Sequence, residues 1–322
     1  YAYPGTPSTE ITEYIQCAEE TRTRNIHCQW SANEKTAMET ALGMSYAGKR
    51  ALVCMKHVGM NVAADCFMNA AVTGTNGGLV IVAADDPSMH SSQNEQDSRV
   101  YGKFALIPVL EPSNQQEAYD LVRYGFALSE TIGSPILLRI TTRLAHSRSG
   151  VNTAAPLNEN SLKLPENKRQ FVLLPAIARK RYRLLLDKQA DFKEASANSP
   201  FNRYTEGQDY SLGIITCGIG HNYLMENYPD GCPYPTAKIC QYPLPRKIIK
   251  TILSKCERIL VLEEGYPVIE ELLKGYPGDK RISGRLDGTI SRDGELSPDI
   301  VAKALNLPVR EGADVPKLVV PR

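Results

Sequence analysis

Apolar residues follow two alternating patterns along the first 145 positions of the chain. Short apolar runs have the length and composition of buried strands and predict five strands, at 26–30, 51–55, 79–84, 107–110 and 135–140. Elsewhere apolar residues recur every three or four positions, which is the spacing of one helix face. This pattern predicts helices at about 7–18, 31–47, 62–72 and 113–131. Strands that alternate with helices of this length predict a parallel sheet with helices on both faces.

Several helix ends carry signals of their own. Thr6 is a good N-cap, with Pro7 at the first helical position, where the missing N–H costs nothing. Ser31 stands three residues before Glu34 in the S-x-x-E order of a capping box, and Ser113 opens a similar signature. Gly48 has the position of a C′ residue that ends the helix 31–47.

The alternation of strands and helices stops after about residue 145. Residues 146–210 begin with a stretch rich in Ser, Asn and Pro and continue into a strongly basic helix at 176–192, so we interpret them as a linker with a helical excursion. A second α/β unit is predicted at 211–322. Its elements are strands at 212–217, 237–240 and 259–263, and helices from about 221 and at 268–273. We therefore expect a first domain at 1–145, the linker, and a second domain at 211–322.

Composition excludes several classes of function. A net charge of +1 argues against electrostatic capture of nucleic acid or of a membrane surface. No apolar run approaches the roughly 18 residues of a spanning helix. The eight cysteines form no C-x-x-C pair, which argues against a zinc site or an iron–sulfur cluster held by this chain. We expect reduced, mostly buried thiols in a cytoplasmic protein, without a metal site of its own.

Candidate chemistry gathers where the predicted strand 51–55 ends. Lys56 and His57 leave this strand in a predicted loop that continues through Gly59 and Asn61, and Glu34 lies in the first turn of the preceding helix. Ligands bind at the carboxyl edge of open α/β sheets. The ordinary alternatives stay open from these residues alone. Glu34 can cap its own helix, the loop can be a polar turn, and Thr6 can be an N-cap and nothing more.

A polar stretch at 85–99 has no periodicity, and a loop of this length inside a domain is functional or disordered in most proteins. It contains Asp86 and His90, but its irregular spacing does not suggest a metal site, and a solvated lid is the ordinary alternative. The basic run at 179–181 is typical of a solvated helix face, although it could meet an acidic partner.

Five motifs change the balance between these alternatives. They lie at 3–11, at 30–35 (Trp-Ser-Ala-Asn-Glu-Lys), at 55–59, at 61–65 and at 85–99. In order and spacing they resemble the α subunits of indolepyruvate:ferredoxin oxidoreductases. In the second unit, 214–220 and 261–264 are similar to the transketolase-C-like domain of that family. The resemblance covers essentially the whole chain.

The resemblance implies thiamine diphosphate chemistry. Residues 1–145 would be the domain that holds the aminopyrimidine of the cofactor, and Glu34 matches the catalytic glutamate that contacts its ring nitrogen N1′. Thr6 matches a threonine near the substrate carboxylate in related pyruvate oxidoreductases. We add three hypotheses of our own. His57 assists catalysis beside the cofactor. Lys56, His57, Gly59 and Asn61 form the cofactor loop. Asp86 and His90 contact substrate. The pair Asp85-Asp86, which stands where pyruvate-type relatives have an arginine, favours a bulky, less polar 2-oxo acid.

The chain lacks parts that the family possesses. It contains no Gly-Asp-Gly…Asn motif for magnesium and diphosphate and no cysteine-rich segment for iron–sulfur clusters, so we expect it to be part of a longer polypeptide and to be inactive alone. The whole enzyme would convert an aryl-pyruvate and coenzyme A into aryl-acetyl-CoA, reduce ferredoxin, and work with a smaller β subunit, as a homodimer through this chain. The alternatives are a related enzyme for another 2-oxo acid and a non-catalytic assembly subunit.

Overall fold

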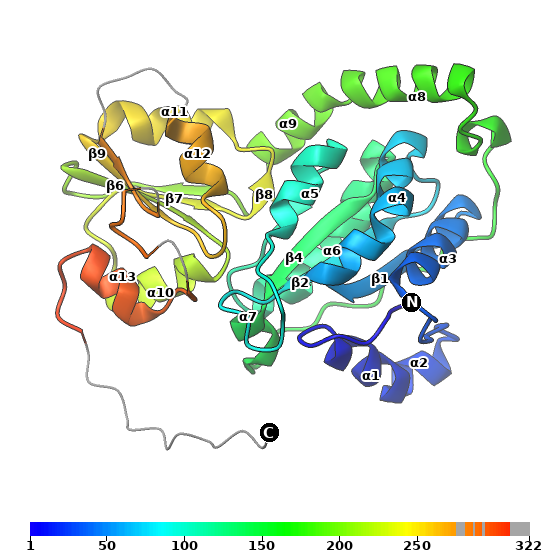
Figure 1. The fold of residues 1–322 in the computed structure, drawn as a ribbon, viewed down its shortest axis with the longest axis horizontal. Helices are drawn as coiled ribbons and strands as arrows, with labels where there is room; N and C mark the ends of the chain where they lie inside the picture. The colour runs from blue at the N-terminus through cyan, green and yellow to red at the C-terminus, as the bar shows by residue number, and fades with distance from the viewer. Residues whose placement is uncertain (275–280, 286, 292–293, 310–322) are drawn as a thin grey trace.

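The computed structural model describes residues 1–274, 281–285, 287–291 and 294–309. Two α/β units lie side by side, and a helical segment runs from the outer end of the first unit to the second (Figure 1). Residues 310–322, the end of the predicted second domain, lie outside the described residues.

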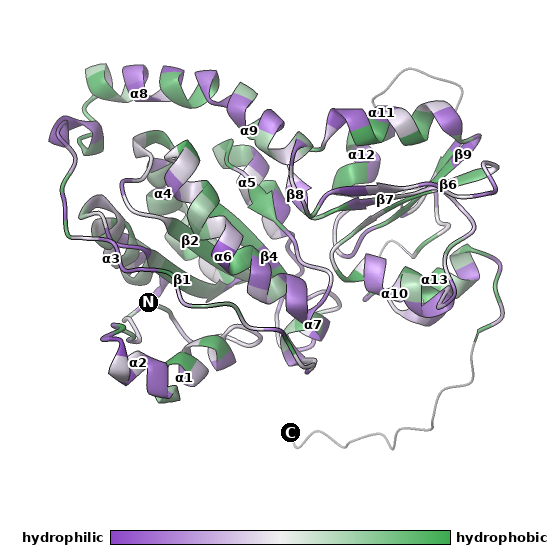
Figure 2. Ribbon diagram, turned by 180° about the vertical axis from the view of Figure 1, so that it is seen from behind, coloured by the Kyte–Doolittle hydropathy of each residue, from purple (hydrophilic) through white to green (hydrophobic). Residues whose placement is uncertain are grey.

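The first sheet has the strand order β1-β2-β4-β3-β8. Its members are β1 (Ala51–Lys56), β2 (Leu79–Asp85), β4 (Ile136–Thr141), β3 (Val109–Leu110) and β8 (Gln241–Tyr242). The strands β1, β2, β4 and β3 are parallel, whereas β8 pairs antiparallel with β3. The strand β8 comes from the second predicted domain, so the two units share a sheet although the boundary at 211 separates them in sequence. Figure 2 shows the strands of this sheet as mostly hydrophobic.

Helices cover both faces of the first sheet, which confirms the predicted architecture. The helices α3 (Glu34–Tyr46) and α4 (His57–Thr73) bury Met38 and Phe67 against Ile81 on one face. The helix α6 (Gln115–Ile132) buries Leu121 against Val80 on the other face. Four shorter helices complete the unit: α1 (Thr9–Cys17), α2 (Glu19–Thr23), α5 (Ser98–Ala105) and α7 (Thr142–His146).

The predicted basic helix at 176–192 is two helices, α8 (Pro175–Asp187) and α9 (Gln189–Ala197), after a 3-10 turn η1 (Lys168–Phe171). Two of its basic residues bind the carboxyl ends of other helices. Arg181 donates to the Thr73 carbonyl at the end of α4, and Lys188 Nζ lies 2.7 Å from the Ile132 carbonyl at the end of α6. Cations are favourable at these negative helix ends. Part of the basic surface therefore fastens α8 to the first unit, while residues 179–180 remain exposed.

The second sheet has the order β10-β9-β6-β7-β5. Its members are β10 (Arg281–Ser283), β9 (Arg258–Leu262), β6 (Leu212–Cys217), β7 (Thr236–Ile239) and the antiparallel edge strand β5 (Arg203–Thr205). The helices α11 (Arg246–Lys255) and α12 (Val268–Lys274) cover one face, and α10 (Ile219–Asn227) and α13 (Pro298–Ala304) cover the other (Figure 1). All eight cysteines are free thiols, and five of them are buried, in agreement with the sequence-based expectation.

Two predictions near the N-terminus are wrong. The segment 26–30 is not a buried strand: Ile26 is exposed, and Trp30 makes only a single bridge to Ala2. Thr6 is not a helix cap, because α1 begins at Thr9 and Ser8 occupies the N-cap position.

Three other helix starts, those of α3, α6 and α4, differ from the prediction. The N-cap of α3 is Asn33 and not Ser31, and the N-cap of α6 is Asn114 and not Ser113. In both cases the asparagine side chain accepts a bond from a first-turn amide, which is a role that asparagine performs as well as serine. The helix α4 begins at His57, five residues earlier than predicted, so Lys56 to Asn61 form its first turns and not a loop.

Candidate functional site

The carboxyl edge of the first sheet brings several predicted site residues together. The strand β1 ends at Lys56 and β2 ends at Asp85, and since the two strands are parallel both ends lie on the same edge. The first turns of α3 and α4 and the irregular segment 86–97 border this edge. Open α/β sheets bind ligands here.

Glu34 is the first residue of α3, but it does not cap the helix. The Asn33 side chain fills that role by accepting the Thr36 amide at 2.8 Å. The Glu34 side chain is nearly buried, with 9% of its residue surface exposed. Within the part of the chain that the structure describes, no hydrogen bond or ion pair is recorded for its carboxylate, whereas buried carboxylates are normally paired. The capping alternative is therefore wrong.

Gly59 explains where the Glu34 carboxylate lies. A Cβ atom at Gly59 would stand 2.5 Å from Glu34 Cγ and 2.8 Å from Glu34 Oε1, so a larger residue would displace the glutamate. Gly59 belongs to the first turn of α4, where backbone amides lack helical partners and the helix dipole is positive. The structure therefore holds a carboxylate without a side-chain partner against a positive helix end.

Lys56 and Asp86 stabilise the segment that follows β2. Lys56 Nζ donates to the Ser91 carbonyl at 2.8 Å and lies 3.8 Å from Asp86 Oδ2. The Asp86 carboxylate accepts bonds from the Ser91 amide at 2.8 Å, from Ser92 Oγ at 2.5 Å and from Thr142 Oγ1 at 2.7 Å. Burial alone would raise the pKa of Asp86, but these donors and Lys56 lower it to about 2. Both side chains already bind the protein, so the geometry favours a structural role for them.

The other candidates differ in their surroundings. The Thr6 carbonyl accepts Ser91 Oγ at 3.3 Å, so Thr6 borders the same segment. His57 is buried, its Nε2 lies 3.2 Å from the Asn94 carbonyl, and its Nδ1 has no partner among the described residues. Asn61 and His90 bind elsewhere: Asn61 accepts the Tyr101 hydroxyl, and His90 Nε2 lies 2.9 Å from Glu295 of the second unit. The structure therefore brings Glu34 and Gly59 together and connects Thr6 with Lys56 and Asp86.

A second group of charges, which we term the junction network, lies between the two units. It consists of two arginines and four acids, all of them buried: Arg99, Arg139, Asp85, Asp97, Glu111 and Glu263. Arg139 of β4 donates to Asp85 at 2.6 Å and to Glu111, and it lies 3.4 Å from Asp97. These contacts remain within the first unit.

Arg99 carries the junction network into the second unit. It donates to Asp97 at 2.9 Å, to Glu263 at 2.9 Å and to the Tyr266 carbonyl at 2.8 Å. The Glu263 carboxylate in turn accepts the first amides of α12, and Arg139 donates to the Glu264 carbonyl at 2.9 Å. Burial alone would raise the pKa of Asp97, but the two guanidinium groups lower it to about 2. The network therefore joins the two units through paired charges.

The junction network was not predicted. The sequence nevertheless contains one sign of it. Arg139 interrupts the apolar run Ile136-Leu-Leu-Arg-Ile140 at the centre of a predicted strand. A buried arginine requires an acidic partner, so this position implied at least one. Nothing in the local sequence shows that the partners come from four other segments.

Glu264 lies beside the junction network, but its carboxylate is not paired as the carboxylates of the network are. Both of its carboxylate oxygens are buried without a hydrogen bond among the described residues, and the hydroxyl of Thr141 is in the same state. Burial raises the pKa of Glu264 to about 7, against the lowering by the nearby Thr141 hydroxyl and Arg139. Glu264 therefore titrates close to neutral pH.

Comparison with known proteins shows which family the chain resembles. Residues 1–190 match the thiamine diphosphate-binding domain of pyruvate flavodoxin/ferredoxin oxidoreductases. The chain is 42% identical over 301 residues to the indolepyruvate oxidoreductase subunit IorA of Pyrococcus abyssi, which is 89% of this chain and 45% of that protein. It is 41% identical over 317 residues to the subunit of the same name from Archaeoglobus fulgidus, which is 95% of this chain and 50% of that protein. The chain thus spans about half the length of the curated relatives it matches.

Solved structures show the same fold at low sequence identity. The 2-oxoglutarate:ferredoxin oxidoreductase of Magnetococcus marinus superposes with a TM-score of 0.72 at 15% identity, over 95% of this chain and 61% of that chain. A split gene transketolase superposes with a TM-score of 0.56 at 14% identity, over 95% of this chain and 90% of that chain. Both likenesses cover both α/β units and show the same fold.

The described residues were also compared with the requirements of a metal site and of a membrane-spanning helix. Within the described residues, no group of three or more His, Cys, Asp and Glu side chains is arranged to hold a metal ion. None of the described helices has both the length and the apolar character needed to cross a membrane.

Proposed function

The chain belongs to the pyruvate flavodoxin/ferredoxin oxidoreductase family, and from that premise we propose that it supplies the aminopyrimidine side of a thiamine diphosphate site. The observation that carries this proposal is the Glu34 carboxylate, nearly buried against Gly59 and without a side-chain partner among the described residues. A carboxylate in that state needs a donor, and the protonated N1′ of an aminopyrimidine is one. The residues present therefore fit the cofactor.

When bound, thiamine diphosphate would supply an acidic carbon, nucleophilic once deprotonated, and an electron sink for decarboxylation. Glu34 holds the proton at N1′, in a place where water is scarce and the hydrogen bond is correspondingly strong. Gly59 keeps the space that this carboxylate occupies. His57 offers its free Nδ1, while its Nε2 faces the Asn94 carbonyl, so it can accept or donate a proton in a fixed ring orientation.

The other site residues surround this pair, Glu34 and Gly59. Lys56 orders the segment beside the cofactor, and Asn61 lies on the same helix as Gly59. We assign Thr6 to the substrate side of the site, together with the backbone that Asp86 holds. His90 would contact substrate only after leaving Glu295. The inference from Asp86 to a bulky 2-oxo acid loses its basis, because the Asp86 oxygens already accept bonds from Ser91, Ser92 and Thr142.

For the complete enzyme we propose the oxidative decarboxylation of an aryl-pyruvate such as indolepyruvate. The bond between the carboxylate and the 2-oxo carbon breaks to give carbon dioxide, a thioester forms to coenzyme A, and two electrons pass through iron–sulfur clusters to two ferredoxins with release of one proton. Support for this substrate comes from the names of the relatives. Magnesium, the diphosphate half of the site and the clusters would come from other parts of the enzyme.

The proposed partners are a smaller β subunit and a second copy of this chain. Exposed apolar residues on the adjacent helices α4 and α5 support such an interface: Val62, Val100 and Phe104. Large exposed apolar side chains that gather on one face favour protein contacts. We further propose a cytoplasmic enzyme, which the free and mostly buried thiols support.

Two alternatives remain to be tested. A related enzyme for another 2-oxo acid would share the site described here, and the structural neighbour that acts on 2-oxoglutarate illustrates this possibility. A subunit that only serves assembly would have no need of a buried carboxylate kept free by a glycine, which is the arrangement of Glu34 and Gly59.

The test uses the complete enzyme, with its partner subunit, thiamine diphosphate and magnesium, under anaerobic conditions. We expect viologen reduction that depends on both indolepyruvate and coenzyme A, and a fall of two to four orders of magnitude in E34Q, roughly the contribution of a catalytic acid–base group. E39Q is the matched control, since Glu39 is exposed on the same helix. A faster rate with pyruvate or 2-oxoglutarate would reject the substrate, and an unchanged rate in E34Q would reject the role of Glu34.

A further inference from the structure

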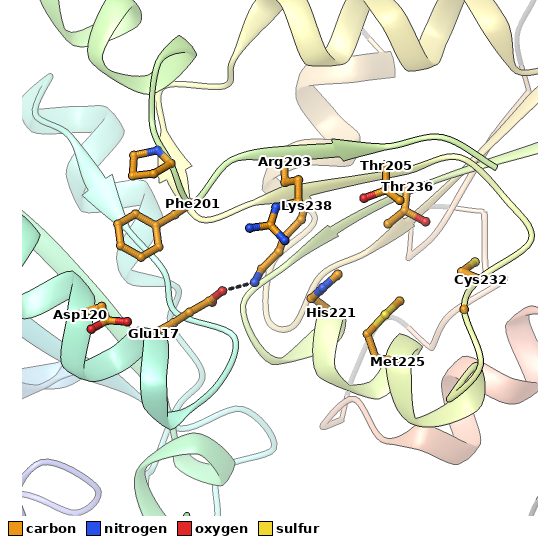
Figure 3. Close-up of a pocket in the computed structure, with 12 residues that line it drawn as sticks. Glu117, Asp120, Phe201, Arg203, Thr205, His221, Met225, Cys232, Thr236 and Lys238 are labelled. Atoms are coloured by element: carbon orange, nitrogen blue, oxygen red, sulfur yellow. Dashed lines mark hydrogen bonds and ion pairs between the residues drawn. The ribbon is translucent and has the colours of Figure 1, made fainter. Parts of the chain in front are cut away.

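A pocket of about 450 Å³ opens between the two units (Figure 3). Its lining shares no residue with the edge that carries Glu34. One wall is the first part of α6, with Glu117 and Asp120, and the opposite wall is α10, with His221 and Met225. Phe201 closes one end, and the volume lies in the range of small-ligand sites.

The floor of the pocket is one face of the second sheet. Arg203 of β5 stands opposite Lys238 of β7, and Thr205 stands opposite Thr236. Side chains two positions apart on a strand share a face, so these four polar side chains point the same way. Figure 3 shows them directed into the pocket, together with His221. The polar and exposed side of the edge strand β5 is thus flanked by helices from both units.

The charges of the pocket are only partly paired. Lys238 Nζ bonds to Glu117, which also accepts the Ser113 amide at 2.9 Å and hydroxyl at 2.7 Å. The Arg203 guanidinium, in contrast, has no hydrogen bond or ion pair recorded with any described residue, and it points toward Lys238 in Figure 3. Asp120 lies on the outer side, beside Phe201, where Gln116 donates to it at 3.2 Å. The lining therefore holds two acids and two bases, and Arg203 is the base without a recorded partner among the described residues.

His221 lines the same pocket as these two basic side chains. Its Nδ1 lies 3.1 Å from the buried Thr216 hydroxyl, and no partner is recorded for its Nε2 among the described residues. Burial, followed by the charges of Lys238 and Arg203, lowers the pKa of His221 to about 4, with Glu117 opposing. The imidazole is therefore neutral at pH 7 and leaves Nε2 available to a ligand.

We propose that this pocket binds a small organic anion whose carboxylate or phosphate lies among Arg203, Lys238 and His221 and whose apolar part packs on Phe201 and Met225. A forked guanidinium suits both anions, because each presents two oxygens to it. The walls come from α6 and from the second unit, so a bound anion also strengthens the contact between the two units. The site is separate from the cofactor edge and belongs to an effector and not to the reacting substrate.

The test is equilibrium binding to the complete enzyme, loaded with its cofactor. The probes are phenyl phosphate, 3-phenylpropionate, inorganic phosphate and the neutral 3-phenylpropanol. We expect saturable binding of the two aryl anions, weaker binding of inorganic phosphate, and none of the alcohol. R203Q should weaken the aryl anions at least tenfold, while R179Q, which removes the same charge from the exposed surface of α8, should leave their binding unchanged.

The comparison of phenyl phosphate with 3-phenylpropionate identifies the preferred anion. A second measurement follows the His221 imidazole by nuclear magnetic resonance: a bound anion should raise its pKa, and R203Q should abolish that rise. Binding that R203Q and R179Q weaken equally, binding of the alcohol as tight as that of the anions, or an unmoved His221 would overturn the proposal. None of these results bears on E34Q turnover, so the two proposals can fail separately.

Discussion

At the edge of the first sheet, the buried His57 Nδ1 has no partner among the described residues, and no hydrogen bond is recorded there for the carboxylate of the nearly buried Glu34. At the junction, Arg99 and Arg139 are buried as well, but they donate to carboxylates and carbonyls from both units. Burial costs each of these groups its hydration. In the junction network, hydrogen bonds and ion pairs within the protein replace the lost hydration. At the edge of the first sheet, part of the lost hydration is not replaced, and a bound ligand could replace it.

This contrast separates two roles of buried charge. Paired charges fix the relative position of the two units, because a displacement would leave an ion without a partner in a dry environment. Unpaired groups destabilise the free protein slightly and bind their ligand more strongly for that reason. Variants in the junction network should consequently change the free energy of unfolding, whereas variants at the edge of the first sheet should change turnover.

The largest effect on stability is expected from R139M. It removes the guanidinium that Asp85 and Glu111 bind, and leaves these carboxylates buried without it. We expect the free energy of unfolding to fall by about 3–5 kcal/mol. Chemical denaturation followed by circular dichroism measures it, with R179M as the exposed control and E34Q as the comparison from the edge. A loss in R139M no larger than in E34Q would contradict the distinction.

The next effect is a pH dependence of the free energy of unfolding, caused by Glu264, the buried carboxylate without a recorded hydrogen bond. The pKa of Glu264 is about 7, above the ordinary 4.5 of a glutamate. Between these values the folded chain holds a proton that the unfolded chain releases. The free energy of unfolding should therefore fall as pH rises from 4.5 to 7, by up to about 3 kcal/mol, and level off above pH 7.

The variant E264Q removes this proton uptake. Denaturation at pH 5, 6, 7 and 8 should show that wild type loses stability relative to E264Q as the pH rises through this window. E257Q is the control, because Glu257 is exposed. Parallel pH profiles for wild type and E264Q would show that Glu264 is ionised in the folded chain throughout.

A smaller effect is expected at the edge from G59A. The new methyl group would lie 2.5 Å from Glu34 Cγ and would displace the carboxylate. A shift of about 1 Å at a reacting group can cost on the order of 100-fold in rate. Turnover of the complete enzyme should fall on that scale in G59A. G43A is the control on α3, where a Cβ meets nothing within 4 Å, and equal rates in the two variants would contradict the assigned contact.

The smallest effect is expected from R181Q, which lies in neither region. Arg181 donates to the Val72 and Thr73 carbonyls at the end of α4. Loss of a cation at a helix end costs about 0.3–1 kcal/mol, and catalysis should stay unchanged. Denaturation and turnover assays measure both quantities. A loss as large as that of R139M would mean that α8 is part of the junction in energetic terms.

The sequence predicted the edge better than the junction, for a physical reason. The edge depends on local order: a strand, a helix start and a glutamate at a fixed spacing. The contact between Glu34 and Gly59 agrees with the predicted proximity of these two segments, and their role in one site stays a prediction. The start of α4 was predicted too late, because the first turn of a helix can have the composition of a polar loop. The junction depends on contacts between segments more than 100 residues apart, such as Arg99 with Glu263. Only the isolated Arg139 indicated that such partners exist.

Errors at the N-terminus have a similar origin. The segment 26–30 has strand-like composition, yet it borders residues 1–3 at the surface, where Ser31 donates its amide to the Ala2 carbonyl. Strand composition shows what a segment can form, and tertiary contacts decide what it does form. The pocket at Arg203 and Lys238 could not be predicted at all, because the first unit contributes one of its walls.

The most direct test of the central claim, that Glu34 serves N1′ of the cofactor, is a double change in protein and cofactor. Wild type and E34Q are each assayed with thiamine diphosphate and with an analogue in which C–H replaces N1′. If the carboxylate and the nitrogen act together, either change alone should cost two or more orders of magnitude, and both together should cost little more. Independent costs that multiply would contradict the account and place Glu34 away from the aminopyrimidine.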